Sequence, residues 1–350
     1  MTIKIGLSLD PSMPRFLDVA KEAERIGIDS VWVPEYWAYD AFTPLAAIAA
    51  VTTRLRLATG IAQLGARTPA MLAMTALGVQ AISGGRLILG IGVSGPQVME
   101  GWHGVAFDRP VQRTRETIEI VKLIASGERV AYDGSVYQLP LPGGAGKAIR
   151  SRAESVRIPV YVAALGPANL RLTGELADGW IGNSFFPRTA DVFFDPIAEG
   201  ATRAGRSLAD IDRVVAVSVE FTGDDPAEIE AAGRRHAAGY AFTFGAMGSK
   251  THNFYNDAFA RQGYGPDVAE VQRLWESGDR EAAQNRVPTE IGLGTNLIGP
   301  PDMIRTRLHD YEAAGVTTLR VNPAGNFDAT IATLETLLGL VADLAADVSR

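Results

Sequence analysis

The chain places residues suited to close ligand contact directly after a strongly apolar segment. Residues 86–91 are almost continuously apolar, and the turn Gly-Val-Ser-Gly-Pro follows them at 92–96. Small residues at the carboxyl end of a buried strand let a flat or anionic group approach the backbone closely. The short segment after this turn ends near the titratable residues Glu100 and His103. This stretch therefore predicts one wall of a ligand site.

A second candidate group follows the predicted strand 30–34. Glu35 and Tyr36 come directly after this strand, and Trp37 and Tyr39 are close behind them. A carboxylate among aromatic rings can be desolvated, which would raise its pKa and suit it to donate a proton near neutral pH. The other interpretation is a mixed loop whose aromatic rings simply plug the core.

Two further strand ends carry glycine. Gly60 closes the third predicted strand, where glycine indicates either a bulge with close backbone approach or an ordinary strand end. Leu165, Gly166 and Pro167 lead from a later strand into a helix. Free N–H groups and the positive dipole end at that helix start would suit a phosphate, although Gly-Pro is also a common way to begin a helix.

Composition excludes several kinds of chemistry. The chain has no cysteine, which rules out disulfides and thiolate catalysis, and its four histidines show no metal-binding spacing. It also lacks a Gly-x-Ser-x-Gly elbow and a Walker-type phosphate loop. Arg67 and Lys250 could meet an anionic cofactor tail, but the sequence does not rank them above surface charges. Small-residue turns without such groups indicate that a bound cofactor supplies the chemistry.

The elements that must position these residues alternate between apolar strands and amphipathic helices. Segments that begin near residues 3, 30, 55, 86, 159, 180, 214 and 317 predict eight parallel strands. Eight such strands with helical crossovers close into a (β/α)8 TIM barrel, an α/β fold. The alternative is an open doubly wound sheet, which fits less well because no Gly-x-Gly-x-x-Gly follows the first strand.

Two insertions interrupt the alternation. Residues 130–137 predict a hairpin that turns at Asp133-Gly134, and a loop rich in Gly, Pro and basic residues follows at 140–155. Residues 226–294 are too long for a simple crossover and predict a helical insertion. We therefore expect a single domain over residues 1–350, in which these insertions shape the substrate pocket.

Net charge and hydropathy limit which kinds of partner we expect. The 350 residues are 47% hydrophobic and carry a formal net charge of −7, which argues against a nucleic-acid partner because such partners need a basic face. The sequence predicts no membrane span, since no apolar run reaches the required length, and the chain opens directly on its first strand. The expected location is the cytoplasm, without membrane or nucleic acid as partner.

Taken together, these segments resemble the bacterial-luciferase-like oxidoreductases, and within them the branch that depends on coenzyme F420 and includes methylenetetrahydromethanopterin reductase. The resemblance extends over most of the chain in the expected order. It rests on Thr59-Gly60-Ile61 with residues 67–71, on Ser83-Gly84-Gly85-Arg86 with the strand to Gly92, on residues 94–104, and on the segments 164–167, 177–180 and 297–301.

The resemblance implies a TIM barrel with a deazaflavin lying across its strand ends. It implies a cis peptide bond between Gly60 and Ile61 behind the ring, with Gln63 close to the ring. It also assigns cofactor contacts to the turn Ser94-Gly95-Pro96 and to the backbone of Leu165 and Gly166, the latter pair at the phosphate. Glu35-Tyr36 and Pro96 stand where the sugar-phosphate dehydrogenases of this branch have other residues, which argues against glucose 6-phosphate as the substrate.

The function expected from this resemblance is hydride transfer between the deazaflavin C5 and a small organic substrate. Glu35 or Tyr36 would carry the proton-transfer step, with Glu100 and His103 next in line, and no metal is expected. Two alternatives remain open, namely an FMN-dependent monooxygenase of the same fold and a non-catalytic barrel of the same superfamily. We expect a homodimer or a higher homo-oligomer.

Overall fold

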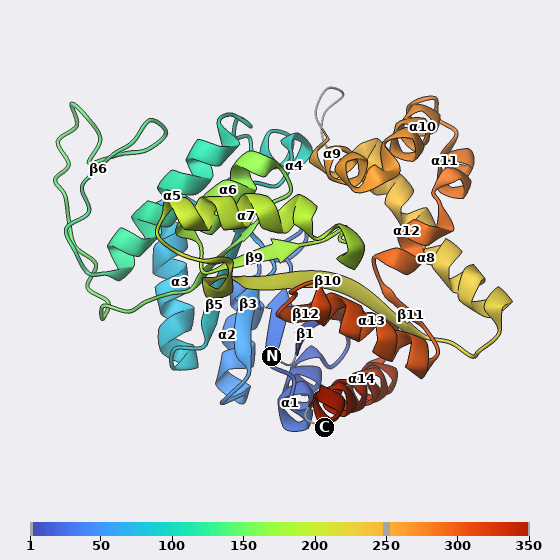
Figure 1. The fold of residues 1–350 in the computed structure, drawn as a ribbon. Coiled ribbons are helices and arrows are strands. Elements are labelled where there is room, and N and C mark those ends of the chain that lie inside the picture. The colour runs from blue at the N-terminus through green and yellow to red at the C-terminus, as the bar shows by residue number, and fades with distance from the viewer. Residues whose placement is uncertain (1–2, 248–252, 349–350) are drawn as a thin grey trace.

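A closed barrel of eight parallel strands forms the centre of the computed structural model, which describes residues 3–247 and 253–348 (Figure 1). Each strand pairs in parallel with the next along the chain, and the barrel closes where the last strand pairs with the first. The predicted TIM barrel is confirmed. The strands are β1 (Lys4–Ser8), β2 (Ser30–Val33), β3 (Arg56–Thr59), β5 (Leu87–Gly92), β8 (Val160–Ala163), β9 (Gly179–Gly182), β10 (Asp212–Phe221) and β12 (Thr318–Pro323).

Helices surround the barrel and bury the outward-facing side of each strand. Leu57 of β3, Val162 of β8 and Leu319 of β12 are fully buried against them in one continuous core. Because both faces of every strand are covered, the strands are near-continuously apolar, as parallel strands generally are. The main helices are α1 (Phe16–Ile26), α2 (Phe42–Val51), α3 (Pro69–Ser83), α5 (Pro110–Ala125), α6 (Pro167–Leu176), α7 (Asp191–Arg203), α13 (Pro301–Ala313) and α14 (Phe327–Val348).

Local signals in the sequence set where these helices begin and end. Helix α3 begins at Pro69, and the Thr68 side chain caps it by accepting a hydrogen bond from the Met71 N–H at 3.2 Å. It ends at Gly84, whose φ of 65° lies in the left-handed region that favours glycine. Such caps fix the helix ends independently of the rest of the fold.

A bulge interrupts the strand that follows β2. Ala58 of β3 pairs with Ile88 of β5, and pairing resumes in β4 (Ala62–Gln63), where Ala62 faces Ile91. Between these two pairs the chain advances four residues from Ala58 to Ala62, but only three from Ile88 to Ile91. The extra residue defines a bulge. The intervening peptide bond between Gly60 and Ile61 is cis, as the resemblance implied. Of the two interpretations of Gly60, the bulge is confirmed.

The barrel interior is apolar at its centre and closed at its amino-terminal end. Trp32, Ile88 and Ile181 point inward and pack together. Below them the Tyr161 hydroxyl donates a hydrogen bond to the Asp212 carboxylate. Burial raises the pKa of the Tyr161 phenol, and the neighbouring Asp212 charge raises it further. Ligand access is therefore confined to the carboxyl ends of the strands.

The predicted hairpin has a longer turn than expected. Strands β6 (Tyr132–Asp133) and β7 (Gln138–Leu139) pair in an antiparallel manner, and residues 134–137 form the turn. The predicted hairpin is confirmed, but its turn begins after Asp133 and spans four residues instead of centring on Asp133-Gly134. Glu116 of α5 explains the difference, because its buried carboxylate accepts hydrogen bonds from the backbone N–H groups of residues 135–137.

The described part of residues 226–294 is mostly helical and has a small core of its own. Figure 1 shows these helices, in yellow and orange, projecting to one side of the barrel. Phe186, Phe244 and Phe259 lie at the centre of this second core. Strand β11 (Leu297–Gly299) then pairs with the far half of β10. The helices are α8 (Pro226–Ala246), α9 (Phe254–Phe259), the π-helical turn Ala260–Tyr264, α10 (Gly265–Glu276), α11 (Arg280–Arg286) and α12 (Thr289–Gly294).

The C-terminal helix α14 is longer and more apolar than the sequence analysis allowed. Its residues Phe327–Ala346 have the length and composition of a membrane span, so the expectation that no segment reaches that length was wrong. Leu334 and Leu337 are nevertheless fully buried in the main core, where α14 packs against α1 and α13. One face of α14 is thus part of the core, whereas 28% of its apolar stretch is buried in all.

Candidate functional site

The bulge forms a floor of small residues at the barrel mouth. A Cβ atom on Gly92 would lie only 2.9 Å from Cδ1 of Ile61, and one on Gly60 would lie 2.7 Å from Nη1 of Arg320. Any larger residue would therefore displace its neighbours or rise into the mouth. Ile61 and Ala163 complete this surface from the neighbouring strands. The floor can accommodate a flat ring pressed against the backbone.

Glu35 lies beside this floor, in a buried ion pair. The two carboxylate oxygens face Arg67, at 2.9 Å from Nη1 and 2.7 Å from Nη2. The carboxylate also accepts a hydrogen bond from the Gln63 N–H at 2.9 Å. Only 6% of the Glu35 side chain and 16% of the Arg67 side chain are exposed. Glu35 and Arg67 thus neutralise each other's charge, and Glu35 is also bonded to β4 through the Gln63 N–H.

Gln63 connects Glu35 to His103. The Gln63 side-chain amide donates to the Glu35 carbonyl oxygen at 2.8 Å, and its Oε1 lies 2.7 Å from His103 Nε2. This distance requires His103 to donate from Nε2, because an amide oxygen can only accept. Glu100 is exposed and accepts from the Phe107 N–H at 3.0 Å. The chain of contacts therefore runs from Arg67 through Glu35 and Gln63 to His103 and does not include Glu100.

The aromatic residues after β2 do not enclose Glu35. Tyr36, Trp37 and Tyr39 are all more than half exposed. The aromatic contact in this group is instead between the Arg67 guanidinium and the ring of Phe42, at 4.9 Å. The expected desolvation of Glu35 by aromatic rings is therefore wrong. These rings line the outside of the mouth, where a bound substrate could contact them.

The turn after β5 leads into a short helix. Ser94 has a φ of 57°, in the left-handed region, and Gly95 precedes α4 (Pro96–Met99). A Cβ on Gly95 would meet no atom closer than 3.6 Å, so the space around it is open. This turn follows directly from the small-residue floor at Gly92. The predicted contacts of Ser94, Gly95 and Pro96 thus lie at the same edge of the barrel as Gln63.

An arginine from the helical insertion reaches the start of α6. Gly166 precedes α6 as its N-cap, and no side chain caps this helix. Arg261 donates from Nη2 to the Leu165 carbonyl oxygen at 2.6 Å, next to this helix start. Free N–H groups and a guanidinium together can bind a phosphate. Sequence reasoning missed Arg261, because nothing local indicates that the insertion folds back onto α6.

Three further side chains meet at the mouth and were also missed. Arg320 of β12 points into the barrel and donates from Nη1 to the Gly60 carbonyl oxygen at 3.0 Å. Its charge acts on the phenols of Tyr36 and Tyr255, and the Tyr255 hydroxyl interacts with the Asn183 side chain. Burial raises the pKa of the Tyr255 phenol, although Asn183 and Arg320 oppose the shift, so Tyr255 is protonated at neutral pH. A charged residue within an otherwise apolar strand was the available signal for Arg320.

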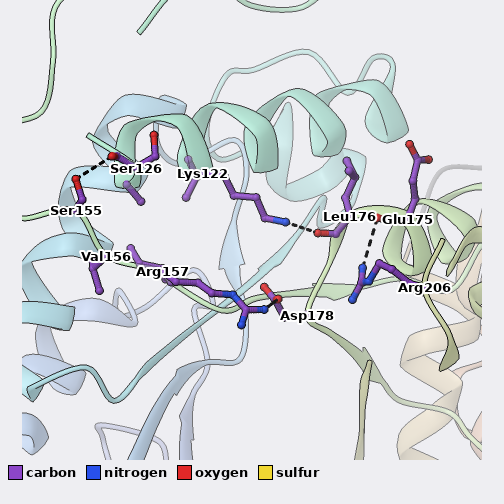
Figure 2. Close-up of a pocket in the computed structure, with 12 residues that line it drawn as sticks. Lys122, Ser126, Ser155, Val156, Arg157, Glu175, Leu176, Asp178 and Arg206 are labelled. Atoms are coloured by element: carbon purple, nitrogen blue, oxygen red, sulfur yellow. Dashed lines mark hydrogen bonds and ion pairs between the residues drawn. The ribbon is translucent and has the colours of Figure 1, made fainter. Parts of the chain in front are cut away.

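A groove of about 640 Å³ lies at the other end of the barrel (Figure 2). It runs between the end of α5 and the residues that precede β8 and β9. Its charges already have partners within the protein, since Arg157 pairs with Asp178 and Lys122 donates to the Leu176 carbonyl oxygen at 2.5 Å. The groove therefore lacks the free groups of the mouth, and the mouth is the better candidate site.

The remaining sequence candidates do not add to the site. Lys250 and His252 lie outside the described residues. Within residues 3–247 and 253–348, no group of His, Asp and Glu side chains could hold a metal ion. His236 pairs with Glu220 at 2.8 Å in the insertion. The side chains with suitable chemistry at the mouth thus come from β4 and β12, from the loops after β2, β4, α4 and β9, and from the helical insertion.

Comparison with known proteins identifies relatives that extend over most of this chain. The chain is 40% identical over 313 residues to a Mycobacterium tuberculosis protein provisionally described as a coenzyme F420-dependent oxidoreductase, with 87% of this chain and 89% of that protein covered. It is 30% identical over 319 residues to 5,10-methylenetetrahydromethanopterin reductase of Methanolobus tindarius, with 90% and 92% covered.

A solved structure shows the same architecture. The coenzyme F420-dependent tetrahydromethanopterin reductase of Methanopyrus kandleri superposes with a TM-score of 0.77 at 25% identity, over 96% of this chain and 98% of that one. The model of the luciferase-like monooxygenase family matches residues 3–318, so this chain belongs to that family.

Proposed function

We propose that this protein is a coenzyme F420-dependent oxidoreductase that transfers a hydride between the deazaflavin C5 and a small organic substrate. The observation that carries the proposal is the floor of small residues beside the Gly60–Ile61 bulge at the carboxyl ends of the strands, where Gly60 and Gly92 lie too close to Arg320 and Ile61 to carry a side chain. The relatives that share 40% and 30% identity are described as an F420-dependent oxidoreductase and a methylenetetrahydromethanopterin reductase. Both descriptions support redox chemistry on a small molecule.

The residues at the mouth fit such a cofactor. Gly60, Ile61 and Gln63 would lie against the ring, and the turn Ser94-Gly95-Pro96 would contact its edge. A Cβ at either Gly60 or Gly92 would clash with neighbouring side chains, which supports a site shaped for close backbone contact. When bound, the cofactor supplies the hydride, which none of the side chains can supply.

The phosphate of the cofactor would lie at the start of α6. The backbone of Leu165 and Gly166 would hold it through free N–H groups. The Arg261 guanidinium next to the Leu165 carbonyl would add a positive charge. This assignment gives the insertion a direct part in cofactor binding.

The chain's own part in the reaction is to orient the ligands and to move a proton. Glu35 was one expected donor, but its commitment to Arg67 and to the Gln63 N–H favours a positioning role for it. Tyr36 is exposed at the mouth and lies within the field of Arg320. We therefore favour Tyr36 over Glu35 as the proton donor expected from the sequence. Replacing Tyr36 by Phe should lower turnover roughly a hundredfold at unchanged cofactor affinity.

Direct binding tests the proposal. Purified protein would be titrated with F420 and, separately, with FMN, while quenching of protein and cofactor fluorescence is recorded. F420 should bind at least tenfold more tightly than FMN. Tight FMN binding without F420 binding would instead support the second candidate, a flavin monooxygenase, in line with the description of the family. Binding of neither would refute a redox role.

The expected homodimer has a candidate interface. Helices α2 and α3 pack side by side, contain no charged residue, and expose Met71, Met74 and Ile82. An apolar face of this kind is typical of a protein–protein contact, and its lack of charge suits a second copy of itself. Met74→Glu should yield monomers in light scattering after size exclusion, whereas Thr306→Glu on the exposed side of α13 should not. A monomeric parent protein would refute this assignment.

A further inference from the structure

Arg320 has fewer hydrogen-bond partners than two other part-buried arginines of the barrel strands and their flanks. Arg86 donates to five acceptors around the start of β5, and Arg213 donates to three carbonyl oxygens at the start of β10. Arg320 donates to one, the Gly60 carbonyl oxygen. Its Nε is buried and has no partner among the described residues. The guanidinium is therefore incompletely satisfied by the protein.

No carboxylate of the described residues pairs with Arg320. The groups that its charge acts on are two phenols, Tyr36 and Tyr255. A buried charge without a counter-charge is costly, and proteins rarely retain one without a use for it. Arg320 keeps partial exposure although it points into the barrel, so the mouth reaches it. An incoming ligand can therefore supply the missing negative charge.

The neighbours of Arg320 define what kind of ligand group fits. The Tyr255 hydroxyl can donate a hydrogen bond, and burial keeps it protonated. The Asn183 Oδ1 is buried and accepts no hydrogen bond from the described residues. The Arg320 charge acts on this phenol, and a cation together with a phenol donor is an arrangement that stabilises an oxygen as it becomes negative. Arg320 also donates to the Gly60 carbonyl oxygen, so its charge lies directly beside the floor at Gly60 and Ile61.

We propose that Arg320 and Tyr255 form an oxyanion site for a carbonyl substrate, with Arg320 and the Tyr255 hydroxyl holding the carbonyl oxygen while Tyr36 protonates it. The proposal rests on the proposed function, which provides the hydride. With the cofactor bound, its hydride would form a bond to the carbonyl carbon, and the electron pair of the C=O double bond would move to the oxygen held by Arg320 and Tyr255. The Tyr36 hydroxyl proton would pass to this oxygen, and solvent would return a proton to the Tyr36 phenolate. The carbonyl would thus be reduced to an alcohol by the two electrons that the cofactor supplies.

The site would bind oxyanions even without turnover, which provides a direct test. The probe is 4-nitrophenol, which ionises near neutral pH and whose anion absorbs visible light whereas its neutral form does not. Protein with and without F420 would be titrated with it, and the ionised fraction of bound probe would be read from the absorbance. The parent protein should bind the anion at least tenfold more tightly than the neutral form.

Variants assign the effect to named residues. Arg320→Met should abolish the preference for the anion, Arg320→Lys should retain part of it, and Tyr255→Phe should weaken anion binding severalfold. Arg157→Met, at the opposite end of the barrel, is the matched control and should behave like the parent. If Arg320→Met does not fold, the test rests on the anion preference of the parent protein and on the reduced preference of Arg320→Lys. A parent that prefers the neutral probe, or Arg320 variants that keep the full preference, would overturn the proposal.

The same samples separate this proposal from the proposed function. Quenching of F420 fluorescence reports cofactor binding independently of the probe. Absence of F420 binding together with a clear anion preference would refute the cofactor and leave the oxyanion site standing. Normal F420 binding without an anion preference would refute the oxyanion site alone.

Discussion

Replacing Glu35 by Gln tests whether this residue positions the site or donates a proton. The substitution keeps the shape of the side chain but removes its charge. If the amide oxygen takes the place that faces the Gln63 N–H, the amide NH2 faces Nη2 of Arg67, so two donors oppose each other. Arg67 then keeps its hydrogen bond from Nη1 to the side-chain oxygen, but its charge, with 16% of the side chain exposed, has only Asp40 at 3.9 Å as a counter-charge.

The loss of stability follows from this geometry. Removing one member of a buried ion pair typically lowers the free energy of unfolding by about 3–5 kcal/mol. Because the amide keeps the shape of the side chain, we expect the lower end of that range, about 3 kcal/mol. The average unfolding entropy per residue, applied to 350 residues, converts that into a fall in Tm of about 4 °C. The same change at Glu175, whose pair with Arg115 is about one-third exposed, should cost under about 1 kcal/mol.

Thermal and denaturant unfolding would measure these changes, with F420 titration on the same samples. The double variant Glu35→Gln/Arg67→Met should be more stable than the sum of its parts, because it leaves no uncompensated charge. Cofactor affinity should change little in the single variant, because Gln63 keeps its hydrogen bonds to the side-chain oxygen and to the carbonyl oxygen of residue 35. A single variant with the parent Tm and a hundredfold lower turnover would refute the reasoning and identify Glu35 as the proton donor.

Three further outcomes are expected. Gly92→Ala should lower F420 affinity about tenfold, because its Cβ would push Ile61 toward the ring; Gly78→Ala, which meets no atom within 4 Å, should leave affinity unchanged in the same titration. Arg261→Met should weaken binding of F420 but not of a deazaflavin riboside without the phosphate, and equal losses for both would contradict the phosphate assignment. Burial acts to raise the pKa of Glu116, but hydrogen bonds from Gln112 and the hairpin backbone outweigh it and lower the pKa. Its contribution is therefore present at neutral pH and lost as pH falls through the lowered pKa, so Glu116→Gln should cost about 2 kcal/mol at pH 7, and urea unfolding should show that difference shrinking in acid.

Much of the barrel could be predicted because its signals are local. Parallel strands covered on both faces are apolar throughout, and helix ends carry their own caps, as Thr68 and Gly84 do for α3. The cis bond at Gly60–Ile61 came from the resemblance, since no local signal distinguishes it from an ordinary strand end. The bulge itself needed the strand pairing, because it is defined by the register of β5 against its neighbour.

The features that were missed depend on contacts between distant parts of the chain. Glu35 and Arg67 are 32 residues apart, and the loop composition around Glu35 suggested aromatic rather than ionic surroundings. Arg261 lies 96 residues from the carbonyl that it contacts. It belongs to the helical insertion, and the hydrophobic pattern of the sequence does not predict where that insertion packs on the barrel. The hairpin turn has a similar cause, because Glu116 of α5 competes for its backbone N–H groups.

Arg67 and Arg320 both reach the barrel mouth, and their partners decide which of them can serve a ligand. The charge of Arg67 is already opposed by Glu35 at hydrogen-bonding distance, so an incoming anion would gain little there and would be repelled by the carboxylate. Arg320 faces phenols and one carbonyl oxygen, so its charge acts on whatever enters. Because it also holds the carbonyl of the bulge on which the ring would lie, the charge and the hydride donor are fixed relative to each other. Selectivity for substrates whose oxygen becomes negative beside the ring then follows from the position of one unpaired cation.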